Sequence, residues 1–151
     1  MKIRNAQSSD VNAVFKLGNS VKQFEVAKDT VYIWPKKILL KIANSNSDVF
    51  LVAEENKNII GFVIANYNKN FSKATMENIF VAPEFRNKGV GEKLFKSAID
   101  KLKKLKCEYV CGLVNTKNKK VISWCVKQGF EKGLNFNWLD KTLSKSFHKK
   151  N

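Results

Sequence analysis

The run Arg86-Asn87-Lys88-Gly89-Val90-Gly91 separates two segments of different periodicity, and it decides the fold. Thr75–Val81, before this run, is predicted to be a strand that ends at Ala82-Pro83. After it, apolar residues recur every three or four positions, which is typical of an amphipathic helix. This apolar stripe consists of Val90, Leu94, Ala98, Leu102 and Leu105, with Phe95 and Ile99 beside it.

A glycine-rich loop between a strand and a helix is suited to binding phosphate. The amides at the helix start point outward, the helix dipole is positive there, and glycine lets a ligand approach the backbone. Taken alone, Gly89-x-Gly91 is equally compatible with a plain turn. The run lacks the Lys-Ser/Thr ending of a nucleotide P-loop, and it lies too far from the N-terminus for the first turn of a dinucleotide-binding fold.

The segments before this run predict a meander of strands. Val49–Ala53 and Ile59–Tyr67 are rich in β-branched and apolar residues, and the polar stretch between them favours a hairpin. With Thr75–Val81 they give three sequential antiparallel strands. Met1–Asn5 is short enough to be an edge strand.

Two helices are expected between the first strand and the hairpin. Ser9-Asp10 offers a cap for an amphipathic helix that ends near Gly18. Trp34-Pro35 begins a second helical pattern, because proline suits a first helical turn. Residues 19–28 have no clear preference.

The segments after the glycine run complete a strand–helix–strand unit. Cys107–Val114 is predicted to be a strand and Asn118–Lys127 a helix that Gly129 stops. Phe130 is expected to start another extended stretch. We expect residues 1–145 to form a single domain and residues 146–151 to fray as a tail.

Charge is the strongest compositional signal. The 28 Lys+Arg against 13 Asp+Glu give a net charge of +15, and residues 76–151 carry 17 of the basic residues. Such a surface favours anionic ligands, so a nucleic-acid-binding module and an enzyme that uses a phosphorylated cofactor are both compatible with it.

Other features narrow the class of protein. No stretch approaches 18 consecutive apolar residues and the first residues lack the pattern of a signal peptide, so we expect a cytoplasmic protein without a membrane span. Cys107, Cys111 and Cys125, with a lone His148, do not have the paired spacing of a zinc site. We therefore expect no metal and reduced, mostly buried thiols.

At this point the sequence resembles the GNAT superfamily of N-acetyltransferases. The pyrophosphate motif of this family reads Gln/Arg-x-x-Gly-x-Gly/Ala between a strand and a helix, and residues 86–91 fit it. Ile79–Pro83 is similar to the family's fourth strand and its exit. Asn118–Phe130 is similar to its last helix followed by a sixth strand. The resemblance covers nearly the whole chain.

The resemblance implies an α/β fold with a mixed, mostly antiparallel sheet, helices on both faces, and a splay between strands four and five that admits acetyl-coenzyme A. Pantetheine would pair with strand four as an added strand would. Lys117, Lys119 and Lys120 would lie near the cofactor phosphates. The cofactor-binding residues that it implies are Ile79, Phe80, Val81, Arg86, Asn87, Lys88, Gly89, Val90, Gly91, Glu92 and Asn118.

The implied reaction is transfer of acetyl from the thioester to a primary amine by direct attack in a ternary complex. Glu77 matches the family's frequent base, and the backbone N–H of Phe80 or Val81 would stabilise the oxyanion. The family often places a tyrosine acid where this chain has Cys125. The Cys125 thiol either protonates the leaving thiolate or only packs.

The acceptor is left open between a small amine or polyamine and a protein amine. A polycation approaching this basic chain would need a local acidic pocket, for which Glu25, Asp29, Glu54, Glu55 and Glu77 are candidates. Trp34 and Trp138 are candidate walls, and the apolar stretch Phe136–Leu143 is a candidate homodimer surface. The alternatives are a basic nucleic-acid-binding module and a GNAT fold that binds coenzyme A without catalysis.

Overall fold

A mixed sheet organises the computed structural model, which describes residues 1–24, 33–135, 137–139, 141 and 143. Within these residues the sheet has five strands in the order β1-β2-β3-β4-β5. All neighbouring pairs are antiparallel except β4 and β5, which are parallel. The strands are β1 (Lys2–Asn5), β2 (Val49–Glu55), β3 (Asn58–Asn68), β4 (Lys73–Val81) and β5 (Tyr109–Gly112).

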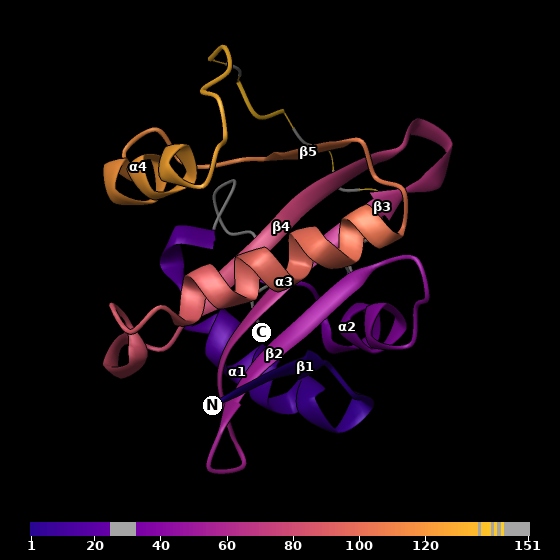
Figure 1. Cartoon of the computed structure of the whole chain (residues 1–151), viewed down its shortest axis with the longest axis vertical. Helices are drawn as coiled ribbons and strands as arrows, with labels where there is room; N and C mark the ends of the chain where they lie inside the picture. Colours follow the sequence, from indigo (N-terminus) through magenta and orange to yellow (C-terminus); the bar gives the residue numbers. More distant parts are fainter. Residues whose placement is uncertain (25–32, 136, 140, 142, 144–151) are drawn as a thin grey trace.

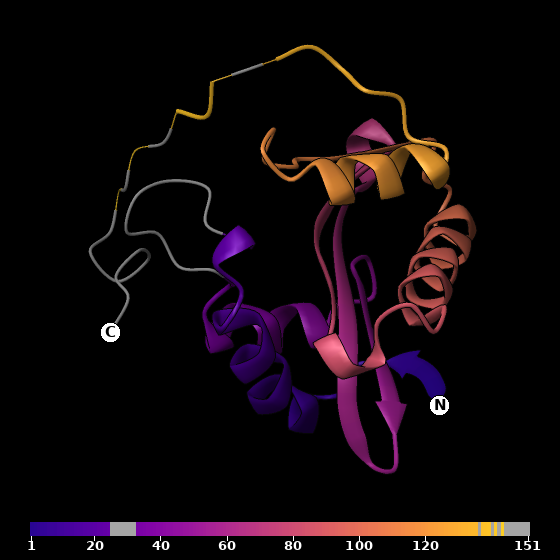
Figure 2. The ribbon, with the colours of Figure 1, turned by 90° about the vertical axis from the view of Figure 1, so that its left-hand side faces the viewer.

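Helices cover both faces of this sheet. Helices α1 and α2 lie against one face and α3 against the other, while α4 lies beyond the β5 end (Figures 1 and 2). The α/β arrangement expected from the sequence is therefore confirmed. The helices are α1 (Val11–Asn19), α2 (Lys36–Ala43), α3 (Val90–Lys104) and α4 (Lys119–Lys127). Short 3₁₀ turns are η1 (Ser8–Asp10), η2 (Lys22–Phe24), η3 (Lys69–Phe71) and η4 (Pro83–Phe85).

Strand alternation divides the core into two halves. On β2, Phe50 and Val52 pack towards α1 and α2, whereas Leu51 and Ala53 pack towards α3. Both halves consist of buried side chains, with partly buried hydrophobic residues packed against them. The largest contributors to the α1/α2 half are Leu39, Phe62 and Ile64, and those to the α3 half are Leu94 and Leu102.

The β3–β4 ladder contains a bulge that matters for the site. Ile64 pairs with Asn78, but the next residue, Ala65, pairs with Met76. Glu77 is the extra residue on β4. Bulges re-aim side chains and bend the strand that carries them, so Glu77 occupies a special position in an otherwise regular strand.

The parallel pairing of β4 with β5 is short. It joins Lys73–Met76 to Tyr109–Gly112 and does not extend to the second half of β4. Because β4 continues to Val81, residues 77–81 have no strand on the β5 side within the described chain. The expected splay between the fourth and fifth strands is confirmed, and it starts at the bulge.

The beginning of α1 differs from the sequence prediction. Asp10 is the N-cap residue of α1, as predicted, but its side chain makes no cap hydrogen bond to α1, because Ser9 and Asp10 belong to η1. Asp10 instead accepts hydrogen bonds from the guanidinium of Arg4 and from the backbone N–H of Gln7. The Asp10 side chain therefore caps η1 and bonds Arg4 on β1 at the same time.

The C-terminal predictions are also corrected. The strand predicted over Cys107–Val114 shortens to β5, because its β4 partner residues end at Met76. Residues 130–135 contain no strand; Phe130 packs its ring against Phe95 at 5.7 Å instead. The predicted tail, residues 146–151, lies outside the described residues.

The predicted helices after the glycine run are confirmed. Asn118 is the N-cap of α4, and Gly129 follows its end with a φ of 90°. No helix among the described residues is both long enough and apolar enough to cross a membrane.

Candidate functional site

The open edge of β4 presents backbone groups to the splay. The Ala82 N–H donates to the Ile60 carbonyl on β3 at 2.9 Å, so the backbone groups of Val81 face the opposite way. The Val81 carbonyl accordingly accepts from Arg86 Nε at 2.9 Å on that side. By the same alternation the backbone groups of Ile79 also face the splay. These two residues offer the hydrogen bonds that an added strand-like ligand needs.

The backbone groups of Phe80 face β3, away from the splay. Its carbonyl oxygen lies 2.7 Å from the point where a Cβ on Gly61 would stand, which places its backbone groups towards β3. Its ring packs at 5.9 Å from that of Phe62 and at 6.4 Å from that of Phe24. Of the two oxyanion donors predicted from the sequence, the geometry therefore favours Val81 over Phe80.

Glu77 stands at the start of the open edge. Its Oε1 accepts a hydrogen bond from Asn66 Nδ2 on β3 at 3.1 Å. Burial raises the pKa of the Glu77 carboxyl above its usual value, and the Asn66 hydrogen bond opposes that rise. A carboxylate with a raised pKa and an oriented oxygen has the properties of a general base.

The glycine run forms an uncapped helix start. Asn87 and Gly89 both have positive φ, 60° and 74°, and Gly89 is the N-cap of α3 without a side-chain cap hydrogen bond. The first intrahelical bond in this turn is from Lys93 N–H to the Gly89 carbonyl, so the amides of residues 90–92 precede it. A Cβ at Gly89 would meet nothing within 4 Å. The turn has open amides of the kind that can bind an anion.

The two cationic side chains of this run lie over aromatic rings. The Arg86 guanidinium is 5.6 Å from the centroid of Phe80, and Lys88 Nζ is 5.5 Å from that of Phe85. Arg86 also donates to the Val81 carbonyl, which joins the run to the open strand edge. Because a guanidinium has five N–H donors, this bond leaves donors that can reach a phosphate.

Helix α4 packs against the start of α3. Trp124 meets Phe95 edge-on at 5.6 Å, and a Cβ at Gly91 would stand 4.0 Å from the Trp124 ring. Cys125 is half-buried, and burial raises its thiol pKa, so the thiol stays protonated near neutral pH. The Asn118 side chain accepts from the Val121 N–H at 3.3 Å as a helix cap.

Of the candidates for an acidic pocket, the described residues Glu54 and Glu55 do not join Glu77. Glu54 pairs with Arg4, and Glu55 lies 3.7 Å from the terminal amine of Met1. Both are on β2, two strands away from β4. Glu25 and Asp29 lie outside the described residues, as does Phe136 of the candidate homodimer surface. Trp138 is exposed, and Trp34 packs against the α1/α2 half of the core.

Sequence reasoning missed Asn66. It is one of the first polar side chains after the apolar run of β3, and strand pairing places it opposite Thr75 on β4. The change from apolar to polar within the strand was its only signal in the sequence. The described residues include no cluster of three or more His, Cys, Asp or Glu side chains that could hold a metal ion.

Comparisons with known proteins agree with this geometry. The family model described as Acetyltransferase (GNAT) family matches residues 19–130. An uncharacterized N-acetyltransferase of Methanocaldococcus jannaschii is 32% identical over 138 residues, which cover 85% of this chain and 60% of that protein. The uncharacterized N-acetyltransferase YhfO of Bacillus subtilis is 29% identical, over 90% of this chain and 93% of that protein.

A solved structure shares the fold. The PaiA N-acetyltransferase of Thermoplasma acidophilum, in complex with coenzyme A, has a TM-score of 0.76 and 21% identity. The match covers 90% of this chain and 93% of that chain.

Proposed function

Because the chain belongs to the GNAT family of acetyltransferases, we propose that it transfers acetyl from acetyl-coenzyme A to a primary amine by direct attack in a ternary complex. One observation carries the proposal: the open edge of β4 runs from Glu77 to the uncapped start of α3. A base, a strand edge and an anion site therefore follow one another along the chain.

The proposed position of coenzyme A follows from the chemistry of its diphosphate and its pantetheine. The diphosphate of coenzyme A suits the amides of residues 87–92, because they carry the positive end of the α3 dipole. Its pantetheine amides suit the backbone groups of Ile79 and Val81. Arg86 would then exchange its bond to Val81 for the phosphates. Lys117, Asn118, Lys119 and Lys120 at the start of α4 are further candidates for the phosphates.

The chain's own residues would move the protons. Glu77 takes the proton of the attacking ammonium, and the Val81 N–H stabilises the oxyanion as the amine adds to the thioester carbonyl. The intermediate collapses with the sulfur of coenzyme A leaving as a thiolate. The protonated thiol of Cys125 is the proposed donor to that thiolate.

Two measurements test this function. Acetyl-coenzyme A should raise the melting temperature by binding the native state. Glu77→Gln should keep that shift but lower kcat/KM for amine acetylation by about a hundredfold or more. Cys125→Ala should lower kcat if the thiol is the acid; unchanged turnover and an unchanged pH profile would assign it to packing.

The remaining outcomes separate the alternatives. A melting shift without acetylation of any amine, protein or peptide would indicate a fold that binds coenzyme A without catalysis. No shift, together with salt-sensitive retention of RNA or DNA, would favour a nucleic-acid-binding module. The three cysteines are free thiols, which suits the proposed location in the reducing cytoplasm.

A further inference from the structure

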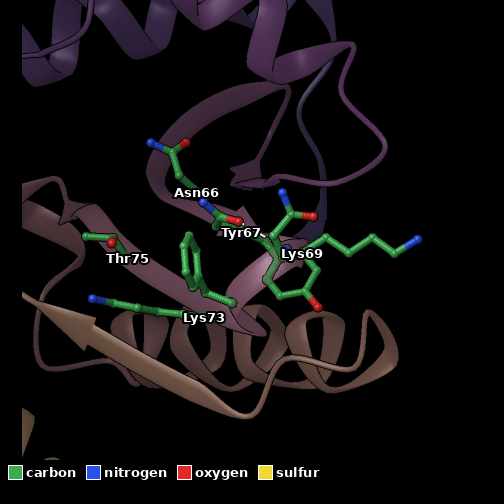
Figure 3. A pocket seen from close by; sticks show the side chains of 8 residues that line it. Asn66, Tyr67, Lys69, Lys73 and Thr75 are labelled. Carbon is green, nitrogen blue, oxygen red and sulfur yellow. Dashed lines mark hydrogen bonds between the residues drawn. The ribbon is translucent and has the colours of Figure 1, made fainter.

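A polar cavity lies at the turn between β3 and β4, next to Glu77. Its volume is about 560 Å³, and Figure 3 shows its side chains. Asn66 and Thr75 are paired across the two strands, as are Asn68 and Lys73, so each pair shares a face of the sheet. In Figure 3 the side chains of Asn66, Thr75 and Lys73 extend to the same side, whereas Lys69 extends to the other.

The cavity is connected to the candidate base by a direct contact. Asn66, which lines the cavity, donates its hydrogen bond to Glu77 Oε1. The Glu77 carboxylate therefore reaches the face on which the cavity opens. An amine held at Glu77 would extend the rest of its molecule along β4 into this cavity.

The charged side chains that line the cavity are all positive. Its lining contains Lys69 and Lys73 and no carboxylate. Lys73 Nζ is also held 5.8 Å over the ring of Tyr109, across the β4–β5 pair. Asp48 accepts the backbone N–H of Tyr67 at 3.2 Å but does not line the cavity, and Glu54 and Glu55 lie two strands away from β4 in ion pairs of their own. No carboxylate in the described lining therefore compensates a polycation.

We propose that the acceptor is a primary amine that also carries an anionic group, which Lys73 binds while the amine meets Glu77. This inference rests on the proposed acetyltransferase function and names its substrate class. It disfavours the polyamine acceptor considered from the sequence, because a second ammonium would face Lys73. Asn66 and Thr75 supply the neutral polar wall between the two charged ends.

The spacing along β4 restricts the acceptor further. A strand rises about 3.3 Å per residue, so the α-carbons of Lys73 and Glu77 are roughly 12 to 13 Å apart. Both side chains are long, so the two charged groups can lie closer together than the α-carbons. The anionic group should therefore lie several bonds from the reacting amine, as in an ω-amino acid or in a peptide with an acidic residue near its N-terminus.

A matched series of amines tests the class. The compounds 5-aminopentanoate, n-pentylamine and cadaverine share one chain and end in a carboxylate, a methyl group and an ammonium. We expect kcat/KM for thiol release to be about fivefold higher for the carboxylate than for the methyl end, the size of one exposed ion pair, and lowest for cadaverine. A parallel series of N-terminal peptides with Asp, Ala or Lys at the third position should give the same order.

Substitutions test whether Lys73 causes the preference for an anionic acceptor. Lys73→Met should abolish the preference and Lys73→Glu should reverse it towards cadaverine, while both keep the acetyl-coenzyme A melting shift. Lys103→Met, which removes an exposed charge from α3 across the sheet, should leave the order unchanged.

Each other outcome has one meaning. Equal or higher kcat/KM for the cationic members, or no acetylation of any anionic amine or peptide, overturns the acceptor class. If another amine or peptide is acetylated in that case, the proposed function survives; if no amine or peptide is acetylated at all, the proposed function fails.

Discussion

Burial and one neighbouring residue together set the pKa of the Glu77 carboxyl. Burial raises its pKa, and the hydrogen bond from Asn66 partly offsets that rise. The same amide also fixes the direction of one carboxylate oxygen. Asn66 is therefore a positioning residue in the proposed reaction: it acts on the acceptor amine through Glu77.

Replacing Asn66 should change the pH dependence of catalysis. In Asn66→Ala the pKa of Glu77 should rise further, because the hydrogen bond that favours the charged form is lost. A base works only when deprotonated, so the acidic limb of the kcat/KM profile should move to higher pH and activity at neutral pH should fall. The profile is measured by thiol release.

The control for this experiment is Asn58→Ala, which alters an exposed asparagine in the β2–β3 hairpin. A uniform loss of activity in Asn66→Ala with no displacement of the acidic limb would contradict the coupling to Glu77.

At the scale of elements, the site depends on where regular structure stops. The parallel β4–β5 pairing ends at Met76 and the bulge follows at Glu77, so the second half of β4 is left open. The glycine run then delivers the start of α3 beside that open edge. Positive φ at Gly89 allows the chain to turn from η4 into the helix.

The two glycines of the run should respond differently to alanine. Gly89→Ala should lower the free energy of unfolding by about 1 to 2 kcal/mol, because a Cβ is strained at a φ of 74°. Gly91→Ala should leave it unchanged or slightly higher, because its Cβ would stand 3.8 Å from Val81 and alanine favours helices. Urea unfolding measures both.

The binding of acetyl-coenzyme A is a second property on which to test the Gly91→Ala variant. The family motif accepts Gly or Ala at the position of Gly91, so Gly91→Ala should keep the melting shift with acetyl-coenzyme A. Complete loss of that shift in a stably folded Gly91→Ala would show that the ligand approaches this residue more closely than the amide-bound diphosphate proposed here.

At the scale of the whole molecule, an ion network fastens the N-terminal strand to the rest of the fold. The Arg4 guanidinium bonds both oxygens of Asp10 at 2.6 and 2.9 Å, and its Nε bonds Glu54 at 2.7 Å. Asp10 is the buried charged residue among those described. The network joins β1, η1 and β2, which hold α1 against the sheet.

This network should make the free energy of unfolding depend on pH in the acidic range. The hydrogen bond from Arg4 is the largest cause that lowers the Asp10 pKa; burial opposes it, and the Gln7 N–H adds to it. A lowered folded-state pKa contributes stability above the unfolded value of about 4 and loses it as the pH falls through the folded-state pKa. Asp10→Asn should cost about 1 to 3 kcal/mol at pH 7.

The difference between wild type and Asp10→Asn should shrink as the pH falls below about 4, because the wild-type carboxyl also becomes neutral. Urea unfolding at several pH values measures it. Asp100→Asn, at an exposed position on α3, is the matched control and should change little. A difference that stays constant across this pH range would assign the effect to packing and not to charge.

The sequence by itself determined the order of the elements and the location of the cofactor motif. Periodicity of two or of three to four reflects which face of each segment is buried, and the positive φ of a turn selects glycine locally. These are short-range properties, so residues 49–127 were predicted nearly element by element. The same reasoning tied part of the net charge of +15 to the proposed anion site at residues 86–91.

Only the tertiary structure decided which neighbours each polar side chain has. Asp10 has the sequence signature of a cap for α1 but bonds Arg4 on β1, and Asn66 gave almost no signal but contacts Glu77 on the neighbouring strand. Both contacts join different elements, so local sequence pattern does not specify them. Strand register also determines where the bulge lies and that the backbone groups of Val81, not those of Phe80, face the open edge. It also puts Lys73 at the cavity beside Glu77. Local pattern specifies elements, whereas the chemistry of the site depends on how their edges are paired.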